Sequence, residues 1–72
     1  MDQRLARKFG AVLKQLRIKN ELSQEALAFE SGMDRTFISM LERGVRQPTL
    51  ETIFRISKVL GIEPSSLIKR VE

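Results

Sequence analysis

Apolar residues recur at spacings of three and four along the first part of the chain, and the positions between them are mostly polar or basic. This is the period of one face of an α-helix. The pattern predicts an amphipathic helix from Gln3 to Lys19, which ends where Asn20 and Glu21 interrupt it. The residues expected on its buried face are Leu5, Phe9, Val12, Leu13 and Leu16.

Two shorter helices are predicted next, joined by a tight turn. Ser23 stands at a favourable N-cap position, ahead of a helix from Gln24 to Ser31. Gly32 ends that helix, because glycine adopts the left-handed conformation of a helix C-terminus without steric cost. A third helix is expected from Arg35 to Arg43, with Asp34 as its N-cap.

The remaining residues predict two more helices, and with them an all-α fold. Thr49 is placed to cap a fourth helix that Gly61 closes, and Pro64 suits the first position of a fifth helix. A chain of 72 residues has to place most of its apolar side chains in a single core to be stable. Residues 1–72 are therefore expected to form one domain, a compact five-helix bundle. The fourth helix is expected to bury Leu50, Ile53, Ile56 and Leu60.

Charge and composition narrow the possible functions without choosing one. Thirteen Lys and Arg against nine Asp and Glu give a formal net charge of +4, which favours an anionic partner but is also found where charges are only solvated. The chain has no cysteine and no histidine, so it has no thiolate metal ligand and no imidazole to bind a metal or shuttle a proton, and its serines have no evident base beside them. We therefore expect neither an enzyme nor a bound cofactor. The sequence contains no signal-like or membrane-length apolar run, so a cytoplasmic protein is expected.

The stretch from Gln24 to about Arg43 meets the physical requirements of a helix-turn-helix. Two short helices that cross steeply need a small side chain at the crossing, which Ala28 supplies, and a turn residue that tolerates positive φ, which Gly32 supplies. Glycine-turned helix pairs also occur in proteins that never bind nucleic acid, so the turn alone does not identify the function. The apolar residues expected to hold the pair to the rest of the domain are Leu27, Met33, Ile38 and Leu41.

Polar side chains remain on the outer side of the third helix, near its N-terminal half. Arg35 carries a planar fork of donors that can pair with both acceptors on the major-groove edge of guanine. Thr36 and Ser39 can bond a base or a phosphate, and Met40 can contact a thymine methyl group. A surface arginine can also be simply solvated, but the start of this helix is where base edges are read. These four residues are the candidate DNA base contacts.

Several spaced motifs agree with one known family. They are LSQE at 22–25, LA at 27–28, RTFIS at 35–39 and LERG at 41–44, followed by Pro48 and LGI at 60–62. On these residues the chain, from about Phe9 to Leu67, resembles the phage Cro and repressor type of helix-turn-helix regulator, the Xre family. The chain length and the run at 34–39 are most similar to the short stand-alone members, such as the controller proteins of restriction–modification systems.

The resemblance implies sequence-specific binding of double-stranded DNA by a homodimeric transcriptional regulator. Such a regulator acts on a two-fold symmetric operator, with its recognition helix, here 35–43, in the major groove. The matched positions imply base contacts at Arg35, Thr36 and Ser39, with Met40 beside them.

The resemblance also implies contacts with the DNA backbone. Gln24 matches a glutamine that contacts a phosphate, and Arg46 matches a position where basic residues reach the backbone. Phe37 stands at a position near the phosphates but has no tyrosine hydroxyl to bond one. The resemblance therefore implies Gln24, Arg46 and Phe37 as candidate phosphate contacts.

Two charged residues at the end of the third helix have competing interpretations. Glu42 is expected to be structural, pairing with Arg17 or capping a turn, because a carboxylate that faced phosphates would be repelled. Arg43 is a further candidate phosphate contact, with a solvated side chain as the alternative.

An apolar surface for association is expected within residues 54–71. The helical pattern places Phe29 and Phe54 on no clear core face, so partial burial is one role for them. An exposed apolar patch usually marks association, and a dimer would place two recognition helices one DNA turn apart, roughly 34 Å. The residues of the expected dimer interface are Phe54, Ile62, Leu67, Ile68 and Val71.

Double-stranded DNA and a second copy of the chain are thus the expected partners, with RNA polymerase as a further candidate and no membrane. One rival class stays open. The same fold could serve as an antitoxin-type module that neutralises a protein, although the chain has little space for a separate interaction segment. Co-purification of a neighbouring gene product would favour this rival.

Overall fold

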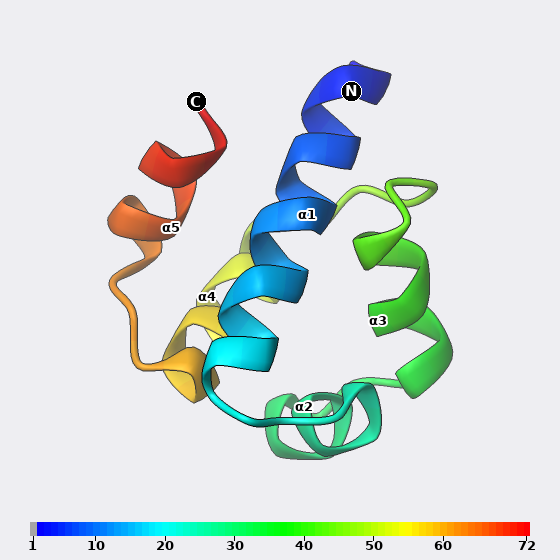
Figure 1. Cartoon of the computed structure of the whole chain (residues 1–72), viewed down its shortest axis with the longest axis vertical. Coiled ribbons are helices and arrows are strands. Elements are labelled where there is room, and N and C mark those ends of the chain that lie inside the picture. The colour runs from blue at the N-terminus through cyan, green and yellow to red at the C-terminus, as the bar shows by residue number, and fades with distance from the viewer. Residues whose placement is uncertain (1) are drawn as a thin grey trace.

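Five helices form within residues 2–72, as the sequence predicts. The computed structural model describes residues 2–72, and within that part of the chain every regular element is a helix. α1 stands between α5 on one side and α3 on the other, while α2 lies across the bottom of the molecule and α4 behind α1 (Figure 1). The bounds are α1 Gln3–Lys19, α2 Gln24–Ser31, α3 Arg35–Glu42, α4 Leu50–Leu60 and α5 Pro64–Val71.

Two of the predicted N-caps form, and one does not. The Ser23 hydroxyl accepts from the Ala26 amide at 3.0 Å, and the Thr49 hydroxyl accepts from the Thr52 amide at 3.1 Å. The Asp34 side chain makes no capping bond to α3, although its backbone is extended as at an N-cap. α3 also ends one residue earlier than predicted, since Arg43 is its C-cap.

The core gathers the apolar face of each helix. The predicted residues of the helix pair hold it there as expected, because Leu27, Ile38 and Leu41 are fully buried and Met33 packs against them. Residues from α1, α4 and α5 complete the same cluster. Its members are Phe9, Leu13, Leu16, Leu27, Ala28, Ile38, Leu41, Ile56, Leu60, Leu67 and Val71.

The prediction of a buried side chain is wrong at two positions. Leu5 and Leu50 are both exposed, and Ala6 and Thr52 are buried instead. Each lies at the start of its helix, where periodicity alone does not define how far the buried stripe extends. Thr52 is accommodated in the interior because its hydroxyl shares a hydrogen bond with that of Thr49, 2.9 Å away.

Gly10 sets the approach of α1 to α3. A β-carbon at this position would overlap the carbonyl oxygens of Leu41 and Glu42, which are backbone atoms and cannot turn aside. No role for this glycine is evident from the sequence pattern. Its close contact places the end of α3 directly against α1, and so determines which polar side chains the two helices share.

The expected dimer interface needs a correction at two residues. Leu67 and Val71 belong to the buried core, because α5 turns this face toward α1 and α4. They cannot also line an exposed surface. Phe54 and Ile68 are exposed, and Ile62 is half-buried. Among residues 2–72, the structure has no helix with the length and apolarity that crossing a membrane requires.

Candidate nucleic-acid interface

The turn between α2 and α3 is held by backbone geometry. Gly32 has φ of +71°, and its amide donates to the Phe29 carbonyl at 3.2 Å. The next amide, of Met33, donates to the Ala28 carbonyl at 2.8 Å. These two bonds close a Schellman-type end of α2, and the chain leaves it at once for α3. Ala28 is buried at this junction, as the helix-turn-helix pattern predicts.

The four candidate base contacts share one side of α3. Arg35 and Thr36 are exposed, and Ser39 and Met40 one turn later are half-buried. On the opposite side Ile38 is fully buried in the core. Residues separated by four positions lie above one another on a helix. The structure therefore brings together a stripe of hydrogen-bond donors and one flexible apolar side chain, facing outward.

An ion pair anchors the far end of α3 to α1. Arg17 Nε donates to Glu42 Oε2 at 2.6 Å, and Arg17 Nη2 donates to Glu42 Oε1 at 3.1 Å. The side chains are only 12% and 4% exposed. The hydrogen bond to Glu42 raises the pKa of Arg17 above its usual value, against the opposing effect of burial. Of the two structural roles considered for Glu42, the structure confirms the pairing with Arg17.

Gln24 lies between this ion pair and the recognition stripe. Its Nε2 donates to Glu42 Oε1 at 3.0 Å, and its Oε1 accepts from Arg35 Nη1 at 3.3 Å. The sequence pattern indicated only a phosphate contact for Gln24. It offered no sign of this link, because Gln24 is separated from Arg35 and Glu42 by 11 and 18 positions along the chain.

Arg46 and Phe37 form a second pair that the sequence did not suggest. The guanidinium of Arg46 lies over the Phe37 ring, 5.6 Å from its centroid. Phe37 is half-buried and packs against the core, whereas Arg46 is exposed. The Phe37 ring thus supports the Arg46 side chain through its aromatic face. This contact does not need the hydroxyl that a tyrosine would carry at position 37.

Arg43 turns back toward its own helix. Its Nε donates to the Ser39 carbonyl at 3.3 Å, at the exposed C-terminal end of α3. A cation here is favourable because the last carbonyls of a helix carry partial negative charge. The remaining donors of the guanidinium are exposed, on the same end of α3 as the loop that holds Arg46.

Comparison with known proteins agrees with this geometry. Residues 13–67 match the family described as Helix-turn-helix. The chain is 48% identical over 61 residues to the control protein C.BamHI of Bacillus amyloliquefaciens, covering 83% of this chain and 75% of that one. It is 42% identical over 66 residues to the control protein C.MunI of a Mycoplasma species, covering 90% and 89%.

A solved structure extends the likeness to three dimensions. The restriction-modification controller protein C.AhdI from Aeromonas hydrophila superimposes with a TM-score of 0.83 at 45% sequence identity, covering 86% of this chain and 94% of that one. Family, sequence relatives and fold therefore coincide over most of the chain. The protein belongs to the helix-turn-helix family of the Xre type, and it is similar in sequence and fold to control proteins of that family.

Proposed function

We propose that this protein is a homodimeric transcriptional regulator that binds double-stranded DNA in a sequence-specific manner, with α3 in the major groove. The observation that carries the proposal is the outward stripe of Arg35, Thr36, Ser39 and Met40 on a helix whose opposite face is fixed in the core. A rigid helix that presents donors to a groove is the usual arrangement of a helix-turn-helix reader. Relatives named control proteins support the same function.

Base recognition is assigned to the stripe. Arg35 pairs with O6 and N7 of a guanine, which discriminates against other bases by about 1–3 kcal/mol. Thr36 and Ser39 donate to base edges or to an adjacent phosphate, and Met40 meets a thymine methyl group.

Backbone contacts are assigned to residues at the margins of the stripe. Arg46 reaches a phosphate from the loop after α3, and Phe37 contributes by supporting it. Arg43 adds a second cation at the same end of α3. Gln24 retains one free amide hydrogen for a phosphate at the start of α2. Cations and amide donors of this kind position the protein without reading sequence.

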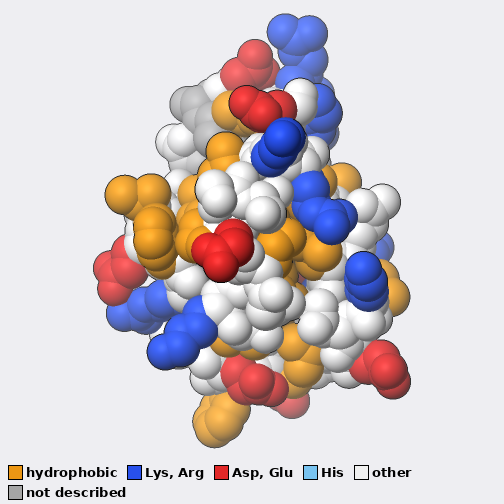
Figure 2. All heavy atoms as spheres, turned by 90° about the vertical axis from the view of Figure 1, so that its left-hand side faces the viewer, with side chains coloured by type: hydrophobic (Ala, Val, Ile, Leu, Met, Phe, Trp, Pro, Cys, Tyr) orange, Lys and Arg blue, Asp and Glu red, His pale blue; other side chains and the backbone are white. Residues whose placement is uncertain are grey.

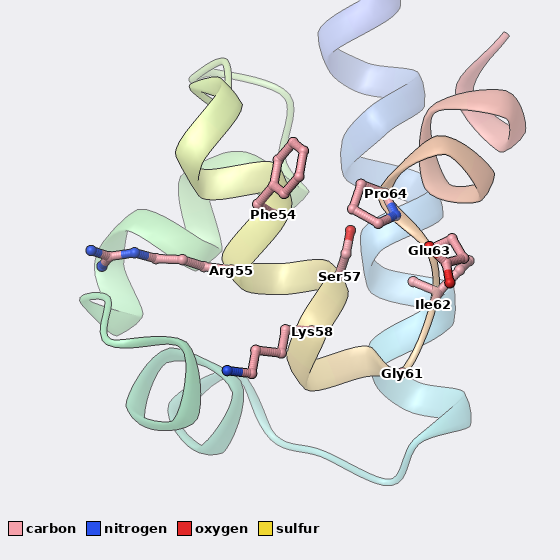
Figure 3. A pocket seen from close by; sticks show the side chains of 8 residues that line it. All are labelled: Phe54, Arg55, Ser57, Lys58, Gly61, Ile62, Glu63 and Pro64. Atoms are coloured by element: carbon pink, nitrogen blue, oxygen red, sulfur yellow. The ribbon is translucent and has the colours of Figure 1, made fainter.

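Dimerisation is assigned to the α4–α5 side. Hydrophobic side chains lie in patches between separate charges on the side of the molecule that carries α5 (Figure 2). Phe54 projects from α4 toward Pro64 at the start of α5, and the Ser57 hydroxyl points into the space between them (Figure 3). That hydroxyl is buried without a hydrogen-bond partner among residues 2–72. Phe54, Ile62 and Ile68 form the proposed contact with a second copy.

Three partners and a cellular location follow from this function. The operator and a second copy of the chain are the first two partners. RNA polymerase is the third, because a regulator bound near a promoter meets the polymerase there. The protein is accordingly placed in the cytoplasm, where bacterial DNA lies.

Selection from random duplexes tests the proposal. The wild-type protein is expected to enrich two inverted copies of one half-site, with centres about one DNA turn apart. Sedimentation at tens of micromolar is expected to show a dimer. Enrichment of no common sequence would refute sequence-specific binding, and a monomer that stays monomeric on DNA would refute the dimer.

A further inference from the structure

A chain of hydrogen bonds runs from the buried ion pair to the proposed base-reading arginine. Arg17 bonds both carboxylate oxygens of Glu42, Glu42 Oε1 accepts from Gln24, and Gln24 accepts from Arg35. Its inner end is nearly inaccessible to solvent, and its outer end is exposed on the recognition stripe. A buried group and a surface group are thereby connected through a single amide.

The charges of Glu42 and Arg35 determine which group donates and which accepts in each of these hydrogen bonds. An ionised carboxylate only accepts hydrogen bonds, so Glu42 requires Gln24 to present its NH₂ group. The amide then has its carbonyl oxygen on the other side, toward Arg35 Nη1. Since a guanidinium only donates, this is the orientation of Gln24 that can hold Arg35. The other N–H donors of Arg35 remain for a ligand.

We propose that Glu42, acting through Gln24, is a positioning residue that holds the Arg35 guanidinium ready for its base. Gln24 then influences which base is preferred, beyond any grip it has on a phosphate. The inference rests on the proposed function, because it needs Arg35 to read a base. Orientation before binding favours recognition, since a side chain that is already held loses less conformational freedom in the complex.

Replacing the Glu42 carboxylate by an amide is expected to reverse which groups donate and which accept along this series of hydrogen bonds. Glu42 Oε2 accepts the shortest bond, from Arg17 Nε at 2.6 Å, whereas Oε1 accepts from both Arg17 Nη2 and Gln24. In Glu42→Gln we expect the single carbonyl oxygen to keep the shortest bond, which leaves the NH₂ group at the Oε1 position, facing Gln24. Gln24 then turns its own carbonyl inward, and its NH₂ group faces the donors of Arg35. The arginine loses its acceptor while the shape of the core is unchanged.

The negative charge can be restored at the next residue of the hydrogen-bond series, position 24. In the double variant Glu42→Gln with Gln24→Glu, the carboxylate at position 24 accepts from the new amide with one oxygen and from Arg35 with the other. The tether to Arg35 is rebuilt with the same net charge. A carboxylate near phosphates lowers affinity for all duplexes alike, so base preference separates this effect from the tether.

The experiment is duplex selection followed by affinity measurement on single-base variants of the enriched site. Arg35→Ala identifies the base pair that Arg35 reads. At that base pair the wild type is expected to prefer its base by about fivefold or more, and Glu42→Gln by less than about twofold. The double variant is expected to recover the preference. The matched control is Glu51→Gln, which removes the carboxylate of the exposed pair with Arg55 and is expected to retain it.

The outcomes separate this inference from the proposed function. A wild type that enriches no site refutes the proposed function itself. A wild type that enriches a site, with Glu42→Gln keeping full preference at the Arg35 base pair, overturns the inference alone. Failure of the double variant to recover preference, with its fold intact, also overturns it. If Glu42→Gln unfolds, Gln24→Leu removes the tether and leaves the Arg17–Glu42 pair, and full preference retained in that variant overturns the inference equally.

Discussion

The guanidinium of Arg46, in the loop between α3 and α4, lies over the ring of Phe37, 5.6 Å from its centroid. Phe37 is anchored by its contacts with the core, and Arg46 is exposed. The ring therefore restricts a long cationic side chain that would otherwise move freely. This arrangement matters for the proposed function because Arg46 is the cation assigned to the DNA backbone.

The variant Phe37→Leu tests this support. Leucine keeps the apolar contact with the core but removes the aromatic face, so binding is expected to weaken by about two- to fivefold for every duplex sequence. The measurement is affinity for the enriched site and for unrelated duplexes at one salt concentration. In an Arg46→Ala background the same change is expected to have no effect, because the cation is absent. An equal loss in both backgrounds would show that the pair does not act together.

The Arg17–Glu42 pair predicts a large difference between two arginine variants. Arg17→Met leaves the Glu42 carboxylate buried without its cation, which is expected to lower the free energy of unfolding by about 3–5 kcal/mol. Arg55→Met breaks the exposed pair with Glu51 and is expected to cost about 0–1 kcal/mol. Urea unfolding at neutral pH measures both. Similar losses for the two variants would contradict the burial of the Arg17 pair as the source of its importance.

The proposed dimer surface can be tested with two exposed phenylalanines. Phe54, 55% exposed on the α4–α5 side, is expected to tolerate lysine in the monomer but to lose self-association by about tenfold or more, since a charge would be buried in the contact. Phe29→Lys is the control, because Phe29 is 85% exposed on α2, away from that surface. Sedimentation across a concentration series gives the dissociation constants. The surface is misassigned if Phe29→Lys weakens the dimer and Phe54→Lys does not.

Local signals made the helices predictable. Ser23, Thr49 and Pro64 mark helix starts through backbone chemistry that acts within one turn, and Gly32 marks an end for the same reason. The buried stripe was less predictable at its margins. Leu50 is the first residue of α4, and its apolar side chain is exposed because it lies beyond the buried face of that helix.

The terminal helix shows the same limit of sequence patterning. Leu67 and Val71 follow a helical spacing that is equally compatible with the core and with a partner surface. Only the packing of α5 on α1 and α4 decides between them, and it places both in the core.

The candidate residues of the site and the Arg17–Glu42 pair could be proposed from the sequence, whereas the hydrogen bonds of Gln24 could not. Arg35, Thr36 and Ser39 are candidates because of their places in the helix-turn-helix pattern and their donor groups, and their contacts with bases stay a prediction. The two hydrogen bonds of Gln24 cross from α2 to α3, so they depend on how these two helices pack together. Such packing joins residues distant in sequence, and nothing in local patterning records it.

Parallel selection with wild type and Arg35→Ala decides whether α3 reads DNA through Arg35. The wild type is predicted to enrich inverted half-sites, and Arg35→Ala to enrich the same half-site with preference lost at one base pair in each, a change of about 1–3 kcal/mol in discrimination. Enrichment profiles that are identical for the two proteins, with affinity lowered uniformly in the variant, would show that Arg35 does not read a base.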